Sequence, residues 1–130
     1  MTETSTDTQI QTGDRWAIAP SIDALGDGMF RQVRVPMGLT AFGMNVKVMQ
    51  PGKTSINHLH TEQQEVMFIH SGSVDVTFGD GTTHHVGETG IVRIDPGEAH
   101  VVRVTSDTPA VIVMMGGKDG IVDGDAVFPE

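Results

Sequence analysis

Two histidines and a glutamate stand close together near the middle of the sequence, and their types and spacing suit metal binding. His58 and His60 are one residue apart, and Glu65 follows five residues after His60. Alternate side chains of a β-strand point to the same face, so a strand here would present both imidazoles together. If residues 61–64 form a turn, Glu65 begins the next strand and its carboxylate returns to the same place.

A third imidazole and the absence of cysteine define the chemistry of this site. His100 follows the turn sequence Pro96-Gly97, which would bring it back toward the other ligands. Because the chain contains no Cys, a metal must be held by nitrogen and oxygen atoms. Such a ligand set suits Mn, Fe, Co, Ni or Zn better than Ca. The predicted metal ligands are His58, His60, Glu65 and His100.

The predicted ligand set leaves two positions of an octahedral ion open to water, dioxygen or a chelating substrate. Glu65 is also the candidate general base, if it leaves the metal during turnover. The alternative interpretation is a surface strand with two solvated imidazoles, which is an ordinary environment for a lone histidine. Four ligand-type residues at matched spacing favour the metal site.

The segments around these residues are short apolar runs separated by turns. From Ser73 to Phe78, apolar and polar residues alternate, which indicates a half-buried strand. Asp80-Gly81 then suits a tight hairpin turn. Further strands are predicted over Leu39–Gln50, Glu65–His70, Ile91–Ile94, Val101–Val104 and Val111–Met115. Because no segment has a sustained helical period, the chain is predicted to be all-β, as a sandwich or barrel.

The two ends of the chain differ from its middle. Residues 1–13 are polar with little to bury, so we predict a mobile N-terminal tail ahead of a single domain over residues 14–130. Asp14–Gly28 contains Trp16 and is predicted to pack as an irregular flap or a short strand. Gly116–Glu130 is rich in Gly and Asp and is predicted to pack loosely over the barrel or onto a partner.

The spacing of the candidate ligands resembles the motifs of the cupin superfamily. The first cupin motif is Gly, five residues, His-x-His, three or four residues, Glu, six residues and Gly. It is matched in full by Gly52, His58, His60, Glu65 and Gly72. In the second motif Gly97 and His100 match, whereas Asp95 replaces Pro, Gly90 is followed by four intervening residues instead of five, and Val104 replaces Asn. The resemblance covers about Gly52 to Val104.

This resemblance implies a double-stranded β-helix, a jelly-roll-like cupin barrel with the metal in its mouth, and association into a homodimer. Cupins include dioxygenases, decarboxylases, isomerases, lyases and non-catalytic binders. The first hypothesis is therefore a dioxygenase-type oxidoreductase that uses Mn or Fe and acts on a small chelating molecule. The alternatives are a non-catalytic metal or small-ligand binder, and a non-redox sugar or uronate isomerase. The chain has no Tyr, which excludes a mechanism with a tyrosinate base.

The composition limits the partners. The formal net charge of -9 repels phosphate backbones, so no nucleic acid partner is expected. No apolar run is long enough to cross a membrane. The N-terminus lacks the basic and apolar regions of a secretory signal, so a cytoplasmic location is expected.

Other residues of chemical interest have structural interpretations. His84 and His85 are adjacent, so in a strand they face opposite ways, and both are predicted at the surface. His70 is predicted to be structural and Glu98 to be a solvated loop residue. Arg34 and Arg93 are candidate anchors for an anionic substrate, although a surface ion pair is favoured for each. The residues predicted to fill the core or wall a pocket are Met44, Met49, Met67, Met114 and Met115.

Overall fold

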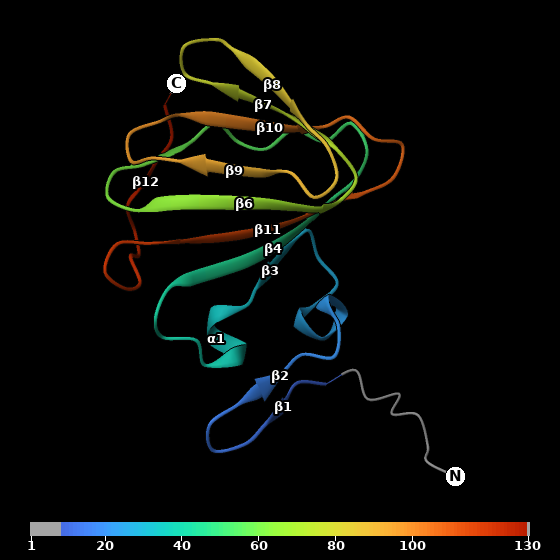
Figure 1. The fold of residues 1–130 in the computed structure, drawn as a ribbon, viewed down its shortest axis with the longest axis vertical. Helices are drawn as coiled ribbons and strands as arrows, with labels where there is room; N and C mark the ends of the chain where they lie inside the picture. The colour runs from blue at the N-terminus through green and yellow to red at the C-terminus, as the bar shows by residue number, and fades with distance from the viewer. Residues whose placement is uncertain (1–8, 130) are drawn as a thin grey trace.

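Two antiparallel sheets packed face to face make up the body of the molecule (Figure 1). The computed structural model describes residues 9–129. The larger sheet has five strands in the order β3-β4-β11-β6-β9. Their bounds are Phe30–Gln32 (β3), Gly43–Met49 (β4), Ala110–Gly117 (β11), Gln64–Ser71 (β6) and Ile91–Ile94 (β9). Each neighbouring pair in this sheet is antiparallel.

The second sheet carries the segment with the predicted ligands along one edge. Its strands are His100–Val104 (β10), Val74–Phe78 (β7) and Thr83–Val86 (β8), in the order β10-β7-β8. The other edge of β10 is bridged by Thr54 opposite Arg103 and by His58 opposite His100. Just after this bridge, Leu59–His60 (β5) pairs with Ala126–Val127 (β12). The ligand segment is therefore held between β10 and the C-terminal end of the chain.

The core lies between the two sheets and follows the alternation of the sequence. Val74 and Val76 of β7 are fully buried, at 0% exposure, as their period of two predicts. They pack in one cluster with residues of β4, β6, β9, β10 and β11, and Phe78 packs against its edge. The buried members are Met49, Met67, Ile69, Val74, Val76, Ile94, Val102, Val104, Ala110 and Ile112. Burying their apolar surface is the main stabilising contribution to the fold.

The strands predicted from apolar runs are confirmed, with shifts at their ends. Ile91–Ile94 is reproduced residue for residue as β9. The largest shift is at β4, which begins at Gly43 and not at Leu39. A single helical turn, Arg34–Met37 (α1), ends there at Gly38 with a positive φ of 66°. The other helical segment in residues 9–129 is the 3-10 turn Ile22–Leu25 (η1), so the all-β prediction is confirmed.

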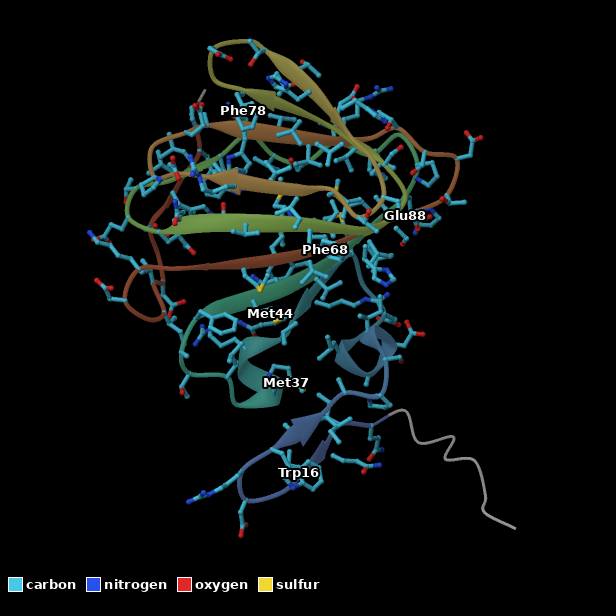
Figure 2. The ribbon with its side chains drawn as sticks, in the orientation of Figure 1. Trp16, Met37, Met44, Phe68, Phe78 and Glu88 are labelled. Carbon is cyan, nitrogen blue, oxygen red and sulfur yellow. The ribbon has the colours of Figure 1, made fainter. Side chains whose placement is uncertain are left out.

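A small hairpin precedes the body. Gln11–Thr12 (β1) pairs with Ala17–Ile18 (β2), and Figure 2 shows Trp16 at the turn between them. The Trp16 indole occupies the space where a side chain on Gly13 would lie. This strand therefore begins inside the segment predicted as a mobile tail, because an aromatic ring covers the glycine. Residues 1–8 of that prediction lie outside the described residues.

The C-terminal segment packs more closely than its composition predicts. Beyond β11 the chain returns to β5, where Asp125 is 6% exposed. The amide N–H of Thr61 donates to the Asp125 carbonyl oxygen at 3.1 Å, which ties this segment to the turn after β5. Within residues 9–129, no helix has the length and apolar character needed to span a membrane.

Candidate metal centre

The pairing of two strands brings His58 and His100 side by side. The two residues exchange backbone hydrogen bonds: the His100 N–H donates to the His58 carbonyl at 3.0 Å, and the His58 N–H donates to the His100 carbonyl at 3.3 Å. Directly opposed residues of an antiparallel pair project to the same face. Their imidazole centroids lie 4.5 Å apart. Residues that are 42 positions apart in the sequence (100 minus 58) are thus placed together by one bridge.

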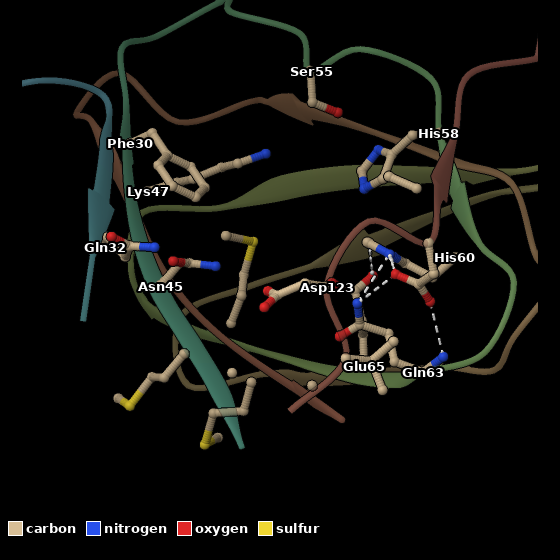
Figure 3. Close-up of a pocket in the computed structure, with 18 of the residues that line it drawn as sticks. Phe30, Gln32, Asn45, Lys47, Ser55, His58, His60, Gln63, Glu65 and Asp123 are labelled. Atoms are coloured by element: carbon tan, nitrogen blue, oxygen red, sulfur yellow. Dashed lines mark hydrogen bonds and ion pairs between the residues drawn. The ribbon is translucent and has the colours of Figure 1, made fainter. Parts of the chain in front are cut away.

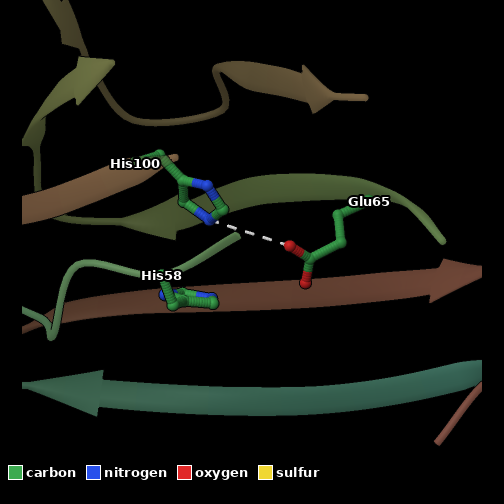
Figure 4. A group of neighbouring side chains, drawn as sticks. All are labelled: His58, Glu65 and His100. Carbon is green, nitrogen blue, oxygen red and sulfur yellow. Dashed lines mark ion pairs between the residues drawn. The ribbon is translucent and has the colours of Figure 1, made fainter. Parts of the chain in front are cut away.

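Glu65 completes a group of three. It stands near the start of β6, and its carboxylate faces the two imidazoles (Figure 4). One ligand atom from each of His58, Glu65 and His100 lies within 4.8 Å of the others. The Glu65 Oε1 is 3.7 Å from His100 Nε2. The structure therefore brings together three of the four predicted ligands.

His60, the fourth predicted ligand, lies against Glu65 outside that group of three. Its Nε2 is 3.2 Å from Glu65 Oε1, and its ring meets that of His58 edge-on at 5.2 Å. The His60 carbonyl accepts a 2.7 Å hydrogen bond from the N–H of Gly97, the motif glycine in the turn before His100. The two cupin motifs are joined directly by this contact.

All three imidazoles are oriented in the same way. The Nδ1 atom of His58 lies 3.0 Å from the Ile56 carbonyl, and that of His100 lies 3.0 Å from the Glu98 carbonyl. The Nδ1 of His60 lies 2.9 Å from the Asp125 carboxylate. These carbonyl and carboxylate oxygens only accept, so each Nδ1 carries the proton and each Nε2 is left with a lone pair. The Gln63 amide nitrogen also lies 3.1 Å from His60 Nδ1, but it donates to the Asp125 carboxylate at the shorter distance of 2.8 Å. A contact between Nδ1 and an oxygen acceptor is typical of imidazoles that bind metals through Nε2.

The donor set fits a cation. With Nδ1 protonated, the Nε2 lone pairs of His60 and His100 face an oxygen of Glu65, and acceptors do not attract one another. A positive ion between them would satisfy all of these groups. His100 is only 3% exposed, and this burial lowers the pKa of its imidazole. A neutral ring is the form that binds a metal.

Asp125 was not recognised as a site residue in the sequence. Its carboxylate accepts hydrogen bonds from the backbone N–H of Glu62 (3.1 Å) and of Gln63 (3.0 Å), and from the Gln63 amide at 2.8 Å. The other contact of this carboxylate is the His60 imidazole, at 2.9 Å. Burial by itself raises the pKa of Asp125, but these hydrogen bonds together lower it well below the usual range. Asp125 lies 65 residues from His60, so no local spacing marks it.

A cavity of about 570 Å³ opens beside the cluster. Its walls come from β3, β4, β6 and β11, from the segment 54–60, and from the C-terminal segment 121–128. Polar side chains from β3 and β4, namely Gln32, Asn45 and Lys47, line it together with apolar Phe30 and Met114. A cavity of this size accommodates a small organic molecule.

The other residues singled out in the sequence lie at the surface, in the core or on the wall of the cavity. Arg34 pairs with Asp123 at 3.2 Å and Arg93 with Asp95, as the favoured surface interpretation predicted. His70, His84, His85 and Glu98 are exposed, and His85 contacts Asp75 at 2.9 Å. Among the methionines, Met49 and Met67 are buried in the core, and Met44, Met49, Met114 and Met115 line the cavity.

The family follows from a match over the middle of the chain. A family model described as a cupin domain matches residues 45–116, which is more than half of the 130 residues. The chain belongs to the cupin family. The resemblance inferred from the two motifs is thereby confirmed. No match was found among curated proteins.

Several solved structures share the fold of this cupin. An uncharacterized conserved protein with a double-stranded β-helix domain from Klebsiella pneumoniae matches with a TM-score of 0.67 and 18% identity, over 85% of this chain and 95% of that chain. A sugar phosphate isomerase of the cupin superfamily from Silicibacter pomeroyi has a TM-score of 0.65 and 20% identity, over 82% and 73%. A DMSP lyase from Ruegeria pomeroyi has a TM-score of 0.58 and 22% identity, over 68% and 43%. At these identities the likeness concerns the fold alone, and it confirms the predicted double-stranded β-helix.

Proposed function

We propose that this cupin is a small-molecule enzyme with a divalent metal ion held by His58, His60, Glu65 and His100. The observation that carries the proposal is the orientation of the three imidazoles. Each has its Nδ1 against a fixed oxygen acceptor, which leaves the Nε2 atoms free beside one carboxylate. Nitrogen and oxygen ligands of this kind favour Mn or Fe, with Ni and Zn as the other candidates.

The protein holds the metal ligands in fixed positions and encloses a cavity beside them. The His58–His100 bridge fixes two ligands on one rigid pair of strands, and Asp125 holds the ring of His60. The cavity beside them admits a small molecule to the open side of the cluster. A bound divalent ion would supply Lewis-acid activation of a substrate's oxygen atoms and, for Mn or Fe, chemistry with dioxygen.

The reaction we favour is a dioxygenase-type oxidation of a small molecule with two neighbouring oxygen groups, such as an enol, a diol or a keto acid. Two adjacent oxygens match the two coordination positions that four protein ligands leave open on an octahedral ion. Glu65 is the candidate base, since it is the one carboxylate within the cluster. A Glu65→Gln variant that keeps its metal and full activity would rule out this role.

A non-redox isomerase is the second candidate, because the similar structures include sugar phosphate isomerases. A non-catalytic binder is the third. Oxygen uptake distinguishes these three functions. It is measured with an oxygen electrode on the metal-loaded protein, with a panel of enediols, catechols and 2-oxo acids as substrates. Oxygen uptake that depends on substrate supports the dioxygenase. Conversion without oxygen, retained with Zn, supports the isomerase, and binding without conversion supports the binder.

The metal site is tested first by elemental analysis of the untagged protein. We expect near one equivalent of Mn, Fe, Ni or Zn per chain in the parent and little in a His58→Ala/His100→Ala variant. A His84→Ala/His85→Ala variant is the matched control, because it also removes two imidazoles but from exposed positions of β8. Equal, negligible metal in the parent and in the site variant would contradict the proposal.

A further inference from the structure

Lys47 is a cation on the wall of the cavity. It lies on β4, opposite Phe30 of β3 on one side and Ile112 of β11 on the other. Cross-strand partners share a face of the sheet, and Ile112 is in the core, so Lys47 faces inward. Figure 3 shows its side chain extending from β4 into the cavity.

The Lys47 ammonium has no direct partner among the described residues. The ion pairs of residues 9–129 neutralise Arg31, Arg34 and Arg93, and none of them, nor any side-chain hydrogen bond, involves Lys47. Its side chain is half-buried, and this burial lowers its pKa although the charge of Glu65 opposes the shift. A half-buried cation without a partner is costly unless an anion approaches it.

Lys47 also lies next to the metal cluster. Lys47 lines the large cavity together with His58 and Glu65. A second, much smaller cavity of about 10 Å³ is lined by Lys47 and Ser55 together with His58, Glu65 and His100. An anionic group at Lys47 and an oxygen at the cluster can therefore belong to one small molecule, separated by few bonds.

The other residues that line the cavity indicate what surrounds a ligand bound between Lys47 and the metal cluster. Gln32 and Asn45 are cross-strand partners two residues along from the Phe30–Lys47 pair, and their amides line the same cavity. Phe30, Met114 and Phe128 provide apolar surface around them. Arg34, which also lines the cavity, is paired with Asp123, so one unpaired cation remains for one negative group.

We propose that Lys47 is a specificity-determining residue that binds the carboxylate of a small 2-hydroxy or 2-oxo acid whose neighbouring oxygen reaches the metal site. This inference rests on the proposed function, because the second oxygen needs the metal. A single ammonium acts as a point charge that matches one carboxylate. Adjacent carboxylate and hydroxyl or oxo groups allow one small molecule to contact both Lys47 and the metal site, which line the same cavity.

The test is a binding measurement with mandelate and its neutral counterpart mandelamide. Both carry a hydroxyl group and an apolar ring, and they differ in the charge that Lys47 would recognise. Calorimetric titration is carried out on the Mn-loaded parent and on Lys47→Met, Lys47→Arg and Lys53→Met, with metal content measured on each sample. Lys53 is the control because it is an exposed lysine outside the cavity lining.

We expect mandelate to bind the parent and its Kd to rise about tenfold or more in Lys47→Met, since hydrogen bonds to charged groups are among the stronger ones. Lys47→Arg keeps the charge and should stay within about threefold of the parent. Lys53→Met should equal the parent. Mandelamide should bind the parent more weakly than mandelate and be unaffected by Lys47→Met.

Three outcomes would overturn the inference in a metal-loaded parent: no mandelate binding, equal binding of mandelate and mandelamide, or mandelate binding that Lys47→Met leaves unchanged. The comparison of the two ligands uses the parent alone, so it holds even if a variant fails to fold. A parent that takes up no metal would instead contradict the proposed function, and the metal analysis distinguishes the two failures.

Discussion

At the scale of single residues, the candidate metal centre is defined by what lies behind each imidazole. Two of the Nδ1 atoms contact backbone carbonyls two residues away in the chain, Ile56 for His58 and Glu98 for His100. His60 depends on a side chain, Asp125, which comes from the far end of the sequence. The backbone acceptors belong to the loop residues just before each histidine, whereas the Asp125 contact can be removed by a single substitution.

We expect Asp125→Asn to weaken metal binding. An amide has one oxygen, so it cannot accept from both the His60 ring and the N–H groups of Glu62 and Gln63. Loss of such a contact behind a metal ligand costs about 10-fold to 100-fold in affinity. Competition with a chelating indicator measures the change.

Asp123→Asn is the control for that experiment. Asp123 lies two residues away and also lines the cavity, but its carboxylate contacts Arg34 at the surface. We expect its metal affinity to equal that of the parent. If Asp125→Asn bound metal as tightly as the parent, the role assigned to Asp125 would be wrong.

At the scale of elements, the two glycines of the first motif, Gly52 and Gly72, lie in different surroundings. Gly52 and Gly72 both adopt a positive φ, 79° and 78°, in the left-handed region that disfavours other residues. A Cβ on Gly52 would meet nothing, but one on Gly72 would lie 2.8 Å from the Ala110 Cα and 2.9 Å from the Pro109 carbonyl. The turn between β6 and β7 therefore packs directly on the start of β11.

We expect Gly72→Ala to destabilise the protein more than Gly52→Ala. The left-handed conformation alone costs an alanine about 1–2 kcal/mol, which applies at both positions. At position 72 the contact with backbone adds about 1–3 kcal/mol of overpacking. Urea unfolding followed by circular dichroism gives both values, and equal losses in the two variants would show that the packing contact is unimportant.

At the scale of the whole molecule, apolar surface is concentrated at the N-terminal end. The β1–β2 hairpin projects from the body (Figure 1), and Trp16 on it is 54% exposed. Strand β3 is an edge of the five-stranded sheet. Exposed apolar residues on the hairpin, on α1 and after it are Trp16, Ile18, Val35 and Phe42. Such patches mark interaction surfaces, and an open edge strand invites pairing.

We expect a homodimer that uses this N-terminal surface. Sedimentation equilibrium should give the parent a mass of about twice 13.9 kDa. Trp16→Ser/Ile18→Ser should shift it toward the monomer, because both changes remove apolar surface from the hairpin. Ile91→Ser is the control, since Ile91 is 69% exposed on β9 at the opposite edge of the sheet. A monomeric parent, or a dimer that only Ile91→Ser disrupts, would contradict the prediction that the N-terminal surface forms the dimer interface.

Local sequence patterns predict most of the fold and the three ligands of the cluster, His58, Glu65 and His100. Alternation identifies a strand because the side chains of adjacent residues point to opposite faces of the sheet, so β7 could be predicted from a few residues. β9 was predicted from a short apolar run next to a turn. The positions of His58, Glu65 and His100 follow from fixed spacings beside glycine turns, which are properties of neighbouring residues. The short strand expected within Asp14–Gly28 is present as β2, whereas its partner β1 (Gln11–Thr12) was missed, because no apolar run marks it and Trp16 contacts Gly13 through space.

Tertiary structure decided the features that join distant residues. Asp125 belongs to a segment whose Gly and Asp content predicts only loose packing, and its burial depends on donors 62 to 65 residues earlier. Lys47 and Asn45 are the polar residues of β4, and the sequence alone could not assign their face. The register of β4 with β3 and β11 places Lys47 on the face toward the cavity. Spacing along the chain thus determined which residues can bind a metal. Pairing across the sheets determined which ones meet and what surrounds them, because hydrogen bonds and burial act through space and not along the sequence.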